Sequence, residues 1–448
     1  MKLITKFRSY SQNSKIIIKN TFGAFVVRGF SLIISVLTTP AFISYFNNNE
    51  VLGVWFTMLS VLSWFLNFDL GIGNGLRNQL VKDLTNNDYQ SAKYTLASGF
   101  FSTGIVTILL TVTGTIVISL VNLNNVFNVS SDLLTHNTLL ISTLAIFTGL
   151  MFRFFLATIS SIFFALQLSA VNNFLSLCVA ILQLLFVLIF HFDNVNESMI
   201  NLAIANLLIS NIPIFFAGVI VFVKPLKMCR PKFTDLRKKR IKSILCVGGL
   251  FFVCQILYMC IANTNEIFIT SLYGADYTTQ YSFYYKLMSI MSMLITLGLT
   301  PVWSVVTKAV AEENYIWLKK LFIKIKKIGM FVFAVQFLII PIMQNILNIW
   351  LGVGQVNVKL PTAISFACFF GVFVYSGMLS TIANGMTRLN IPIKGFFLGV
   401  VIKFAVDIFL YKYVDDWSLV VWSNVVAFLP YIIWQQIDLN NFFRKIKL

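Results

Sequence analysis

Ionisable side chains inside long apolar stretches are the first candidates for chemistry in this sequence. Six of them interrupt apolar runs of helical length: Arg28, Arg153, Lys286, Lys403, Glu266 and Asp407. A charge at membrane depth costs about 2.5–3.5 kcal/mol on insertion scales, so each needs a partner or a water-filled cavity. The cations outnumber the carboxylates, and an arginine guanidinium can donate two hydrogen bonds to one phosphate. These residue types predict an interior that binds an anionic headgroup through the four cations.

Three of these cations also have structural explanations. Lys403 and Asp407 are four residues apart, so on one helix they can neutralise each other. Arg28 and Lys286 lie within about two turns of the ends of their predicted helices, so their long side chains can reach a polar interface. The sequence leaves these alternatives open.

Arg153 and Glu266 are harder to explain as structural residues. Arg153 has no acidic residue within a helical turn, which favours a binding role. Glu266 ends the polar run 263–266 in the middle of an apolar segment, where a carboxylate needs water or a partner. Glu266, Asp407 and Asp69 are therefore the candidates for coupling to an ion.

The composition shows which elements must carry these residues. Of the 448 residues, 58% are hydrophobic and 11% are charged, and the mean hydropathy is +0.83. Soluble domains carry about 25% charged residues, so this chain is a polytopic membrane protein. The six Cys and two His are too scattered for a metal framework, and no glycine-rich loop for ATP phosphates is present. We expect no cofactor, no metal site and no enzymatic activity.

Twelve apolar runs approach or exceed the length of about 20 residues that a membrane-spanning helix requires. We predict spans at 22–46, 52–70, 95–121, 137–164, 171–191, 199–223, 244–272, 278–303, 328–350, 360–385, 395–413 and 419–437. Lys and Arg collect in the two tails and in alternate loops, which places both termini in the cytoplasm by the positive-inside rule. Topology thus explains most of the +18 net charge, and nucleic-acid binding is not needed to account for it.

The chain divides into two halves of similar pattern. The basic segment 224–243 carries nine Lys and Arg and separates six spans from six. One constant shift aligns Trp55 with Tyr281 and Tyr89 with Tyr315. Repeats of six helices each would run parallel, related by an axis along the membrane normal. We predict an N-terminal bundle at 1–223, the basic linker at 224–243, a C-terminal bundle at 244–437 and a cytoplasmic tail at 438–448.

The most distinctive string is FDLGIGNGLRN at 68–78. Its three glycines loosen a helix and let another backbone approach closely. The spacing does not match a dinucleotide-binding loop, and no strand precedes it. We predict a hinge whose residues are Gly71, Gly73, Gly75 and Arg77. The alternative is a plain helix terminus capped by Asp69 or Asn74.

With these motifs the sequence resembles the O-antigen and polysaccharide repeat-unit flippases (Wzx type) of the multidrug/oligosaccharidyl-lipid/polysaccharide exporter superfamily. The resemblance covers essentially the whole chain. It rests on Arg28 after a basic tail, GVW at 53–55, the FDLGIGNGLRN string, Pro301 and NGMTR at 384–388. In one departure, relatives often carry an acidic residue at the place of Asn265, whereas here the carboxylate is the adjacent Glu266.

The resemblance implies an all-helical fold of two six-helix bundles around a central cavity that opens alternately to each side. The substrate would be an undecaprenyl-diphosphate-linked oligosaccharide, moved from the cytoplasmic to the outer leaflet of the bacterial inner membrane for O-antigen or capsular polysaccharide synthesis. H+ or Na+ would supply the driving gradient. Polysaccharide polymerase or chain-length proteins are the expected protein partners.

Two other functions stay open. A multidrug cation antiporter of the same superfamily would need a cavity of the opposite charge, and the first span lacks the carboxylate of proton-coupled drug extruders. A membrane-embedded glycan polymerase or acyltransferase would need clustered His, Arg and Asp, whereas His136 and His191 lie in separate short loops.

Overall fold

A computed structural model provides the structure of the protein. It describes residues 23, 26, 27, 29–31, 34, 38, 41–67, 71–127, 129–351 and 357–445. Every regular element within these residues is helical, which confirms the predicted all-helical class. Arg28 and Asp69 lie outside the described residues, as does part of the predicted first span.

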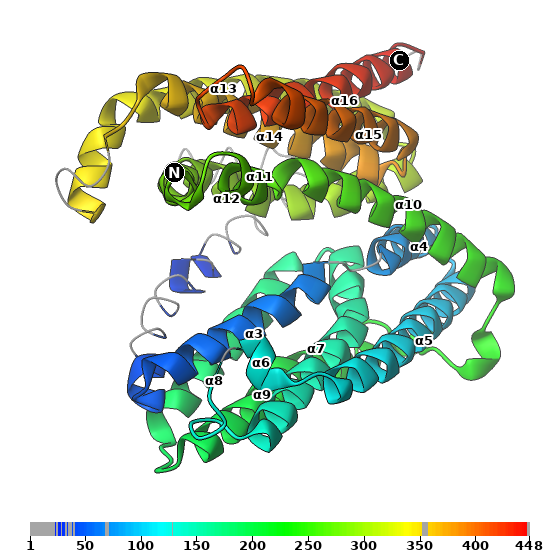
Figure 1. Ribbon diagram of the computed structural model, residues 1–448. Helices are drawn as coiled ribbons and strands as arrows, with labels where there is room; N and C mark the ends of the chain where they lie inside the picture. Colours follow the sequence, from blue (N-terminus) through cyan, green and yellow to red (C-terminus); the bar gives the residue numbers. More distant parts are fainter. Residues whose placement is uncertain are drawn as a thin grey trace, which may run out of the picture. The chain divides into compact units, whose positions relative to one another are not determined.

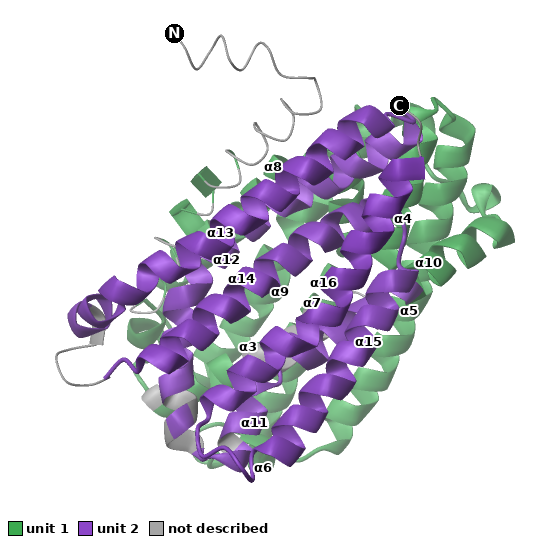
Figure 2. Cartoon of the chain, turned by 90° about the horizontal axis from the view of Figure 1, so that it is seen from above, with its two compact units in different colours: residues 1–249 green, residues 250–448 purple. Residues whose placement is uncertain are grey.

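The chain forms two compact units, residues 1–249 and 250–448 (Figure 2). The first unit contains α3 (Asn49–Asn67), α4 (Ile72–Thr85), α5 (Tyr89–Leu120), α6 (Leu123–Phe127), α7 (His136–Ala165), α8 (Ser169–Ile189), α9 (Val195–Val223) and the short 3-10 helices η1 (Lys227–Cys229) and η2 (Phe233–Asp235). The second contains α11 (Asn265–Leu272), α12 (Ala275–Ala311), α13 (Tyr315–Leu351), α14 (Leu360–Gly385), α15 (Asn390–Ala405), η3 (Val406–Leu410, a π-helical turn) and α16 (Ser418–Lys445). Helix α10 (Lys238–Ala262) runs from one unit into the other. The basic segment predicted as a linker leads into α10 (Figure 1), and its residues 224–243 lie within the first unit.

The described helices account for the predicted spans other than the first. Nine of them are long and apolar enough to cross a membrane, and Glu50–Leu59 within α3 is a shorter apolar helix. The predicted span 244–272 is divided between α10 and α11 at residues 263–264, and the span 395–413 is divided between α15 and η3. The first interruption comes two residues before Glu266, and the second lies between Lys403 and Asp407.

Two tight turns recur in both halves. Helices α5 and α13 each begin two residues after a residue of positive φ, Asn87 (56°) and Glu313 (55°), and corresponding backbone hydrogen bonds close both turns. Gln167 (62°) and Thr387 (56°) occupy a second pair of matching turns, before α8 and α15. Left-handed backbone is uncommon outside glycine, so its recurrence at equivalent places supports the predicted repeat.

Each unit packs around apolar cores of its own. In the first unit one core surrounds Trp55 and another surrounds Leu76. In the second unit Tyr284, Phe366 and Trp417 pack ring against ring, with centroids 5.4–6.2 Å apart. The outer faces of the long helices are also apolar, as expected of helices that contact lipid.

Candidate functional site

Arg153 lines a polar pocket inside the first unit. The pocket has a volume of about 290 Å³ and lies among α3, α7, α8 and α9. Its polar side chains are Arg153, Ser176, Asn206 and Ser210, and apolar residues such as Leu59 and Leu150 complete the wall. A pocket of this kind, with few polar groups on an apolar lining, is typical of a ligand site.

Close helix packing holds Arg153 in place. A Cβ on Gly149, one turn earlier in α7, would lie 2.9 Å from the Cα atom of Leu207, so only glycine allows α7 and α9 to approach this closely. Asn211 Nδ2 donates to the Gly149 carbonyl at 2.9 Å. On the same side of α9, Arg153 Nη1 donates to the Ser210 carbonyl at 3.2 Å.

The Arg153 guanidinium keeps most of its hydrogen-bonding capacity. Among the described residues, one hydrogen bond uses its five N–H donors, the bond to the Ser210 carbonyl. No carboxylate within the described residues forms an ion pair with it. A partly buried cation with unused donors in a polar pocket is suited to binding an anionic oxygen.

Lys403 and Asp407 form a fully buried ion pair in the second unit. Lys403 Nζ lies 3.1 Å from Asp407 Oδ2, and neither side chain is exposed. The pair is a contact between charges, because neither carboxylate oxygen accepts a well-aligned hydrogen bond within the described part of the chain. The predicted neutralisation of these two residues is confirmed.

Asn265 is the centre of the polar cluster around that pair. Its Oδ1 atom accepts hydrogen bonds from Lys403 Nζ at 2.8 Å and from Asn424 Nδ2 at 2.7 Å, and its Nδ2 atom donates to the Tyr281 hydroxyl at 3.0 Å. Ser423 Oγ lies 3.4 Å from Lys403 Nζ. The ammonium is therefore surrounded by oxygen atoms from α11, η3 and α16.

The other predicted charges of the second unit lie outside this cluster. Glu266 is exposed although the neighbouring Asn265 is buried, because consecutive residues of a helix point about 100° apart around its axis. Lys286 is exposed on α12. Neither belongs to any ion pair among the residues that the structure describes. The roles of Glu266 and Lys286 stay predictions.

Sequence reasoning did not select the polar residues that complete the cluster. These residues are Asn265, which stands where relatives often carry an acidic residue, and the Ser423-Asn424 pair. Ser423 and Asn424 could have been found from the sequence, because two adjacent polar side chains inside an apolar span need hydrogen-bond partners at membrane depth.

The glycine motif provides a packing surface for α10. Gly71 precedes α4 with φ of 67°, a left-handed conformation that glycine adopts without strain. A Cβ on Gly75 would lie 2.8 Å from the carbonyl oxygen of Ile244, and one on Gly248 would lie 3.1 Å from the carbonyl of Gly71. Arg77 is buried, and its guanidinium lies 5.0 Å from the centre of the Phe164 ring. The predicted role of the motif as a hinge stays a prediction.

An acidic residue at the end of α4 holds the start of α10. Asp83 lies 3.6 Å from Arg240 Nη1 and accepts hydrogen bonds from Thr95 and Gln79. Arg240 also donates to Ser91 Oγ at 2.9 Å. Burial raises the pKa of Asp83, and this effect exceeds the lowering by Thr95, Arg240 and Gln79.

Comparison with known proteins shows the fold. No protein-family model and no curated protein sequence matches the chain. Among solved structures, MATE in the bent conformation has a TM-score of 0.78 at 14% identity, with 97% of each chain covered. MATE in complex with MaD3S has a TM-score of 0.76 at 14% identity, covering 97% of this chain and 98% of that one. A MOP superfamily transporter from Pyrococcus furiosus, described as having a binding pocket of reverse polarity, has a TM-score of 0.75 at 14% identity, with 96% of each chain covered.

These similarities extend over nearly the whole chain. The protein therefore has the fold of MATE transporters of the MOP superfamily, with their twelve-helix architecture. This confirms the predicted fold class.

Proposed function

We propose that the protein is a membrane transporter that translocates an anionic, lipid-linked substrate by alternating access. The substrate class that best fits is an undecaprenyl-diphosphate-linked oligosaccharide. The observation that carries the proposal is the Arg153 pocket, in which the guanidinium has no carboxylate partner within the described residues. An uncompensated cation attracts a diphosphate and repels a cationic drug.

The pocket also offers groups suited to a sugar. Ser176, Asn206 and Ser210 lie beside Arg153, and hydroxyl and amide groups can bond sugar hydroxyls in either direction. Apolar residues on the remaining wall would contact the sugar faces. In this proposal Arg153 is the first diphosphate contact, and Arg28, Lys286 and Lys403 are further candidates.

A second function is favoured by the fold. Solved structures of multidrug MATE transporters share the architecture of this chain, so export of organic cations is the competing proposal. The sign of the charge in the pocket separates the two. A cation exporter requires a carboxylate where this pocket has Arg153.

Coupling to an ion gradient is part of the proposal. Lys403 places its own positive charge at the centre of the oxygen-lined cluster in the second unit. A site already filled by an ammonium favours H+ over Na+ as the coupling ion at Asp407. Glu266 and Asp69 are the alternative coupling carboxylates.

Deletion of the gene followed by lipid analysis tests the substrate. We expect lipid-linked repeat units to accumulate on the cytoplasmic leaflet and surface polysaccharide to be lost. Normal surface polysaccharide together with increased sensitivity to cationic toxins would instead establish the drug exporter. Reconstitution in vesicles tests the coupling, since equal transport with and without a proton gradient would exclude it.

A further inference from the structure

Two apolar grooves on the first unit share one wall. The first has a volume of about 460 Å³ and lies between α5 and the basic segment, and the second has a volume of about 420 Å³ and lies among α5, α7 and α9. Phe100 and Phe155 line both grooves, with their ring centroids 5.9 Å apart. Because the two grooves are similar in volume and share this aromatic wall, they could hold two apolar chains, one on each side of the wall.

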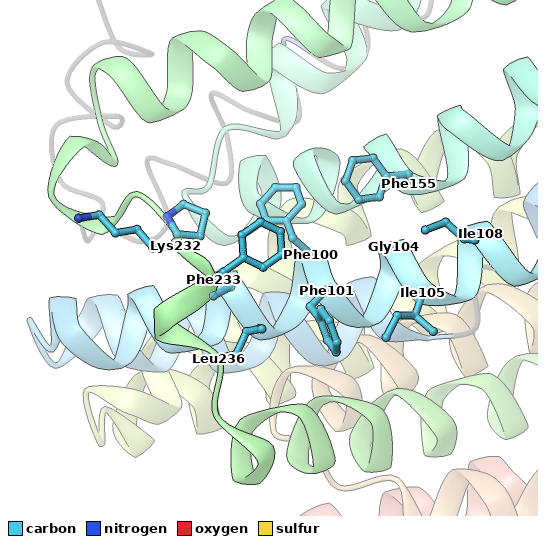
Figure 3. A pocket seen from close by; sticks show the side chains of 11 residues that line it. Phe100, Phe101, Gly104, Ile105, Ile108, Phe155, Lys232, Phe233 and Leu236 are labelled. Carbon is cyan, nitrogen blue, oxygen red and sulfur yellow. The ribbon is translucent and has the colours of Figure 1, made fainter.

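The walls of both grooves are almost entirely hydrocarbon. Phe101, Ile105 and Ile108 extend the first groove along α5 (Figure 3). Phe215 and Phe222 of α9 line the second. These faces belong to helices long and apolar enough to cross a membrane, so an apolar occupant can enter from the lipid.

A cation lies at the end of each groove, on the basic segment. Lys232 lines the first groove and Arg230 lines the second. Figure 3 shows the Lys232 ammonium directed away from the aromatic wall. Arg230 donates from Nε to the Phe222 carbonyl at 2.8 Å, which leaves both of its terminal amino groups available.

The surrounding charge is strongly positive. Segment 224–243 carries nine Lys and Arg and a single carboxylate, Asp235. That carboxylate accepts a hydrogen bond from the backbone N–H of Lys232 at 3.1 Å. Between the two cations and Asp235, Phe233 is 87% exposed, as expected of a side chain that enters the membrane interface.

We propose that the two grooves bind the two acyl chains of one anionic diacyl phospholipid, and that Arg230 and Lys232 bind its phosphate. The lipid would fasten the basic segment to the side of α5. Because α10 continues from this segment, the bound lipid would also fix the start of the helix that joins the two units.

Native mass spectrometry of the purified full-length protein tests the headgroup contacts. The probes are phosphatidylglycerol, phosphatidylcholine, lysophosphatidylglycerol and undecaprenyl phosphate, added in detergent. We expect phosphatidylglycerol to be retained in preference to phosphatidylcholine. The double variant Arg230→Gln/Lys232→Gln should lower that retention about tenfold or more, given the usual contribution of a basic residue to anionic lipid binding.

A matched variant separates a specific site from general attraction. Lys238→Gln/Lys239→Gln removes two exposed cations of the same segment that line neither groove. It should retain phosphatidylglycerol like the wild type. An equal loss in both double variants, or no preference for phosphatidylglycerol, would overturn the proposal.

A second variant tests the acyl chains without changing charge. Gly104 lines the first groove, and a Cβ there would meet Phe155 at an ordinary 3.6 Å, so Gly104→Leu fills the groove without a backbone clash. We expect it to weaken phosphatidylglycerol binding and to leave the single-chain lysolipid unaffected. Gly53→Leu, where nothing lies within 4 Å of the added Cβ, is the control. An unchanged Gly104→Leu protein, or preferential Arg230- and Lys232-dependent binding of undecaprenyl phosphate, would refute a phospholipid site.

Discussion

At the scale of single residues, the cations Arg153 and Lys403 have opposite surroundings. Arg153 shares a pocket with hydroxyl and amide groups and has no carboxylate partner among the described residues. Lys403 lies against a carboxylate and two further oxygen atoms, with no exposure. Arg153 is therefore available to a ligand, whereas the charge of Lys403 is already compensated.

Replacing Arg153 should abolish transport and leave the fold intact. Arg153→Gln removes a cation whose hydrogen bonds to a charged group contribute about 1.5–3 kcal/mol each, so substrate affinity should fall by at least about tenfold. Arg153→Lys should retain part of the activity, because a lysine keeps the charge and loses the planar fork. The measurement is translocation of lipid-linked oligosaccharide in vesicles. Lys412→Gln, an exposed cation, is the control, and full activity of Arg153→Gln would remove the residue from the site.

Breaking the buried ion pair should destabilise the protein strongly. Lys403→Met leaves Asp407 charged and unpaired in a dry interior, which costs about 3–5 kcal/mol. The double variant Lys403→Met/Asp407→Leu should recover most of that loss, since no buried charge remains. Thermal unfolding in detergent measures the stability of the single and the double variant. Equal stability of the single variant and the wild type would contradict the burial of the pair.

At the scale of elements, glycines decide how closely the helices pack. Gly75 and Gly248 bring α4 and α10 into backbone contact, and Gly149 does the same for α7 and α9. The contact between α4 and α10 holds α10 against the motif at 71–78, and α10 is the helix that runs from one unit into the other. The same contact explains why a glycine-rich string lies at the start of a short helix.

Gly75→Ala should loosen the contact between α4 and α10. The added Cβ would lie 2.8 Å from the Ile244 carbonyl, so the backbones must separate, at a cost of about 1–3 kcal/mol. Thermal unfolding should show the loss, and transport should fall if the motif acts as a hinge. Gly53→Ala has open space around the new methyl group and should be neutral.

The burial of Asp83 should make stability depend on pH. Burial raises the pKa of Asp83 in the folded protein above its value in the unfolded chain. The folded state therefore binds the proton more tightly, so the contribution of Asp83 to stability is greatest below its unfolded pKa and is lost as pH rises through the raised folded pKa. When the free energy of unfolding is measured across that pH range, it should fall with rising pH in the wild type and change less in Asp83→Asn. If both proteins showed the same pH dependence of unfolding, a group other than Asp83 would be its cause.

At the scale of the whole molecule, each half of the chain carries the same turns and a different site. The repeated left-handed residues at 87 and 313 mark equivalent starts of α5 and α13. The first unit contains the uncompensated Arg153, and the second contains the neutral Lys403–Asp407 cluster. This division assigns substrate binding to one unit and ion coupling to the other in the proposed transporter.

The membrane orientation can be tested by labelling from each side. In a cysteine-free background, Lys239→Cys in the basic segment should react with an impermeant maleimide in inverted vesicles and stay unlabelled in intact cells, because basic loops remain in the cytoplasm. Asn125→Cys, exposed on the short helix α6 in the connection between α5 and α7, which has no Lys or Arg, should show the reverse. Labelling of Lys239→Cys in intact cells would invert the topology.

The sequence by itself determined the helical class and the positions of most spans, and it offered the i,i+4 ion pair as one of two explanations for Lys403 and Asp407. These features are local, since a run of about 20 apolar residues or a four-residue spacing is readable without knowing the fold. Only the tertiary structure decided which charges are available. Lys403 meets Asn265 and Ser423 from distant helices, Glu266 turns away from its buried neighbour, and Arg153 meets no carboxylate within the described chain. Those outcomes depend on the rotation and packing of helices far apart in sequence, which no local pattern encodes.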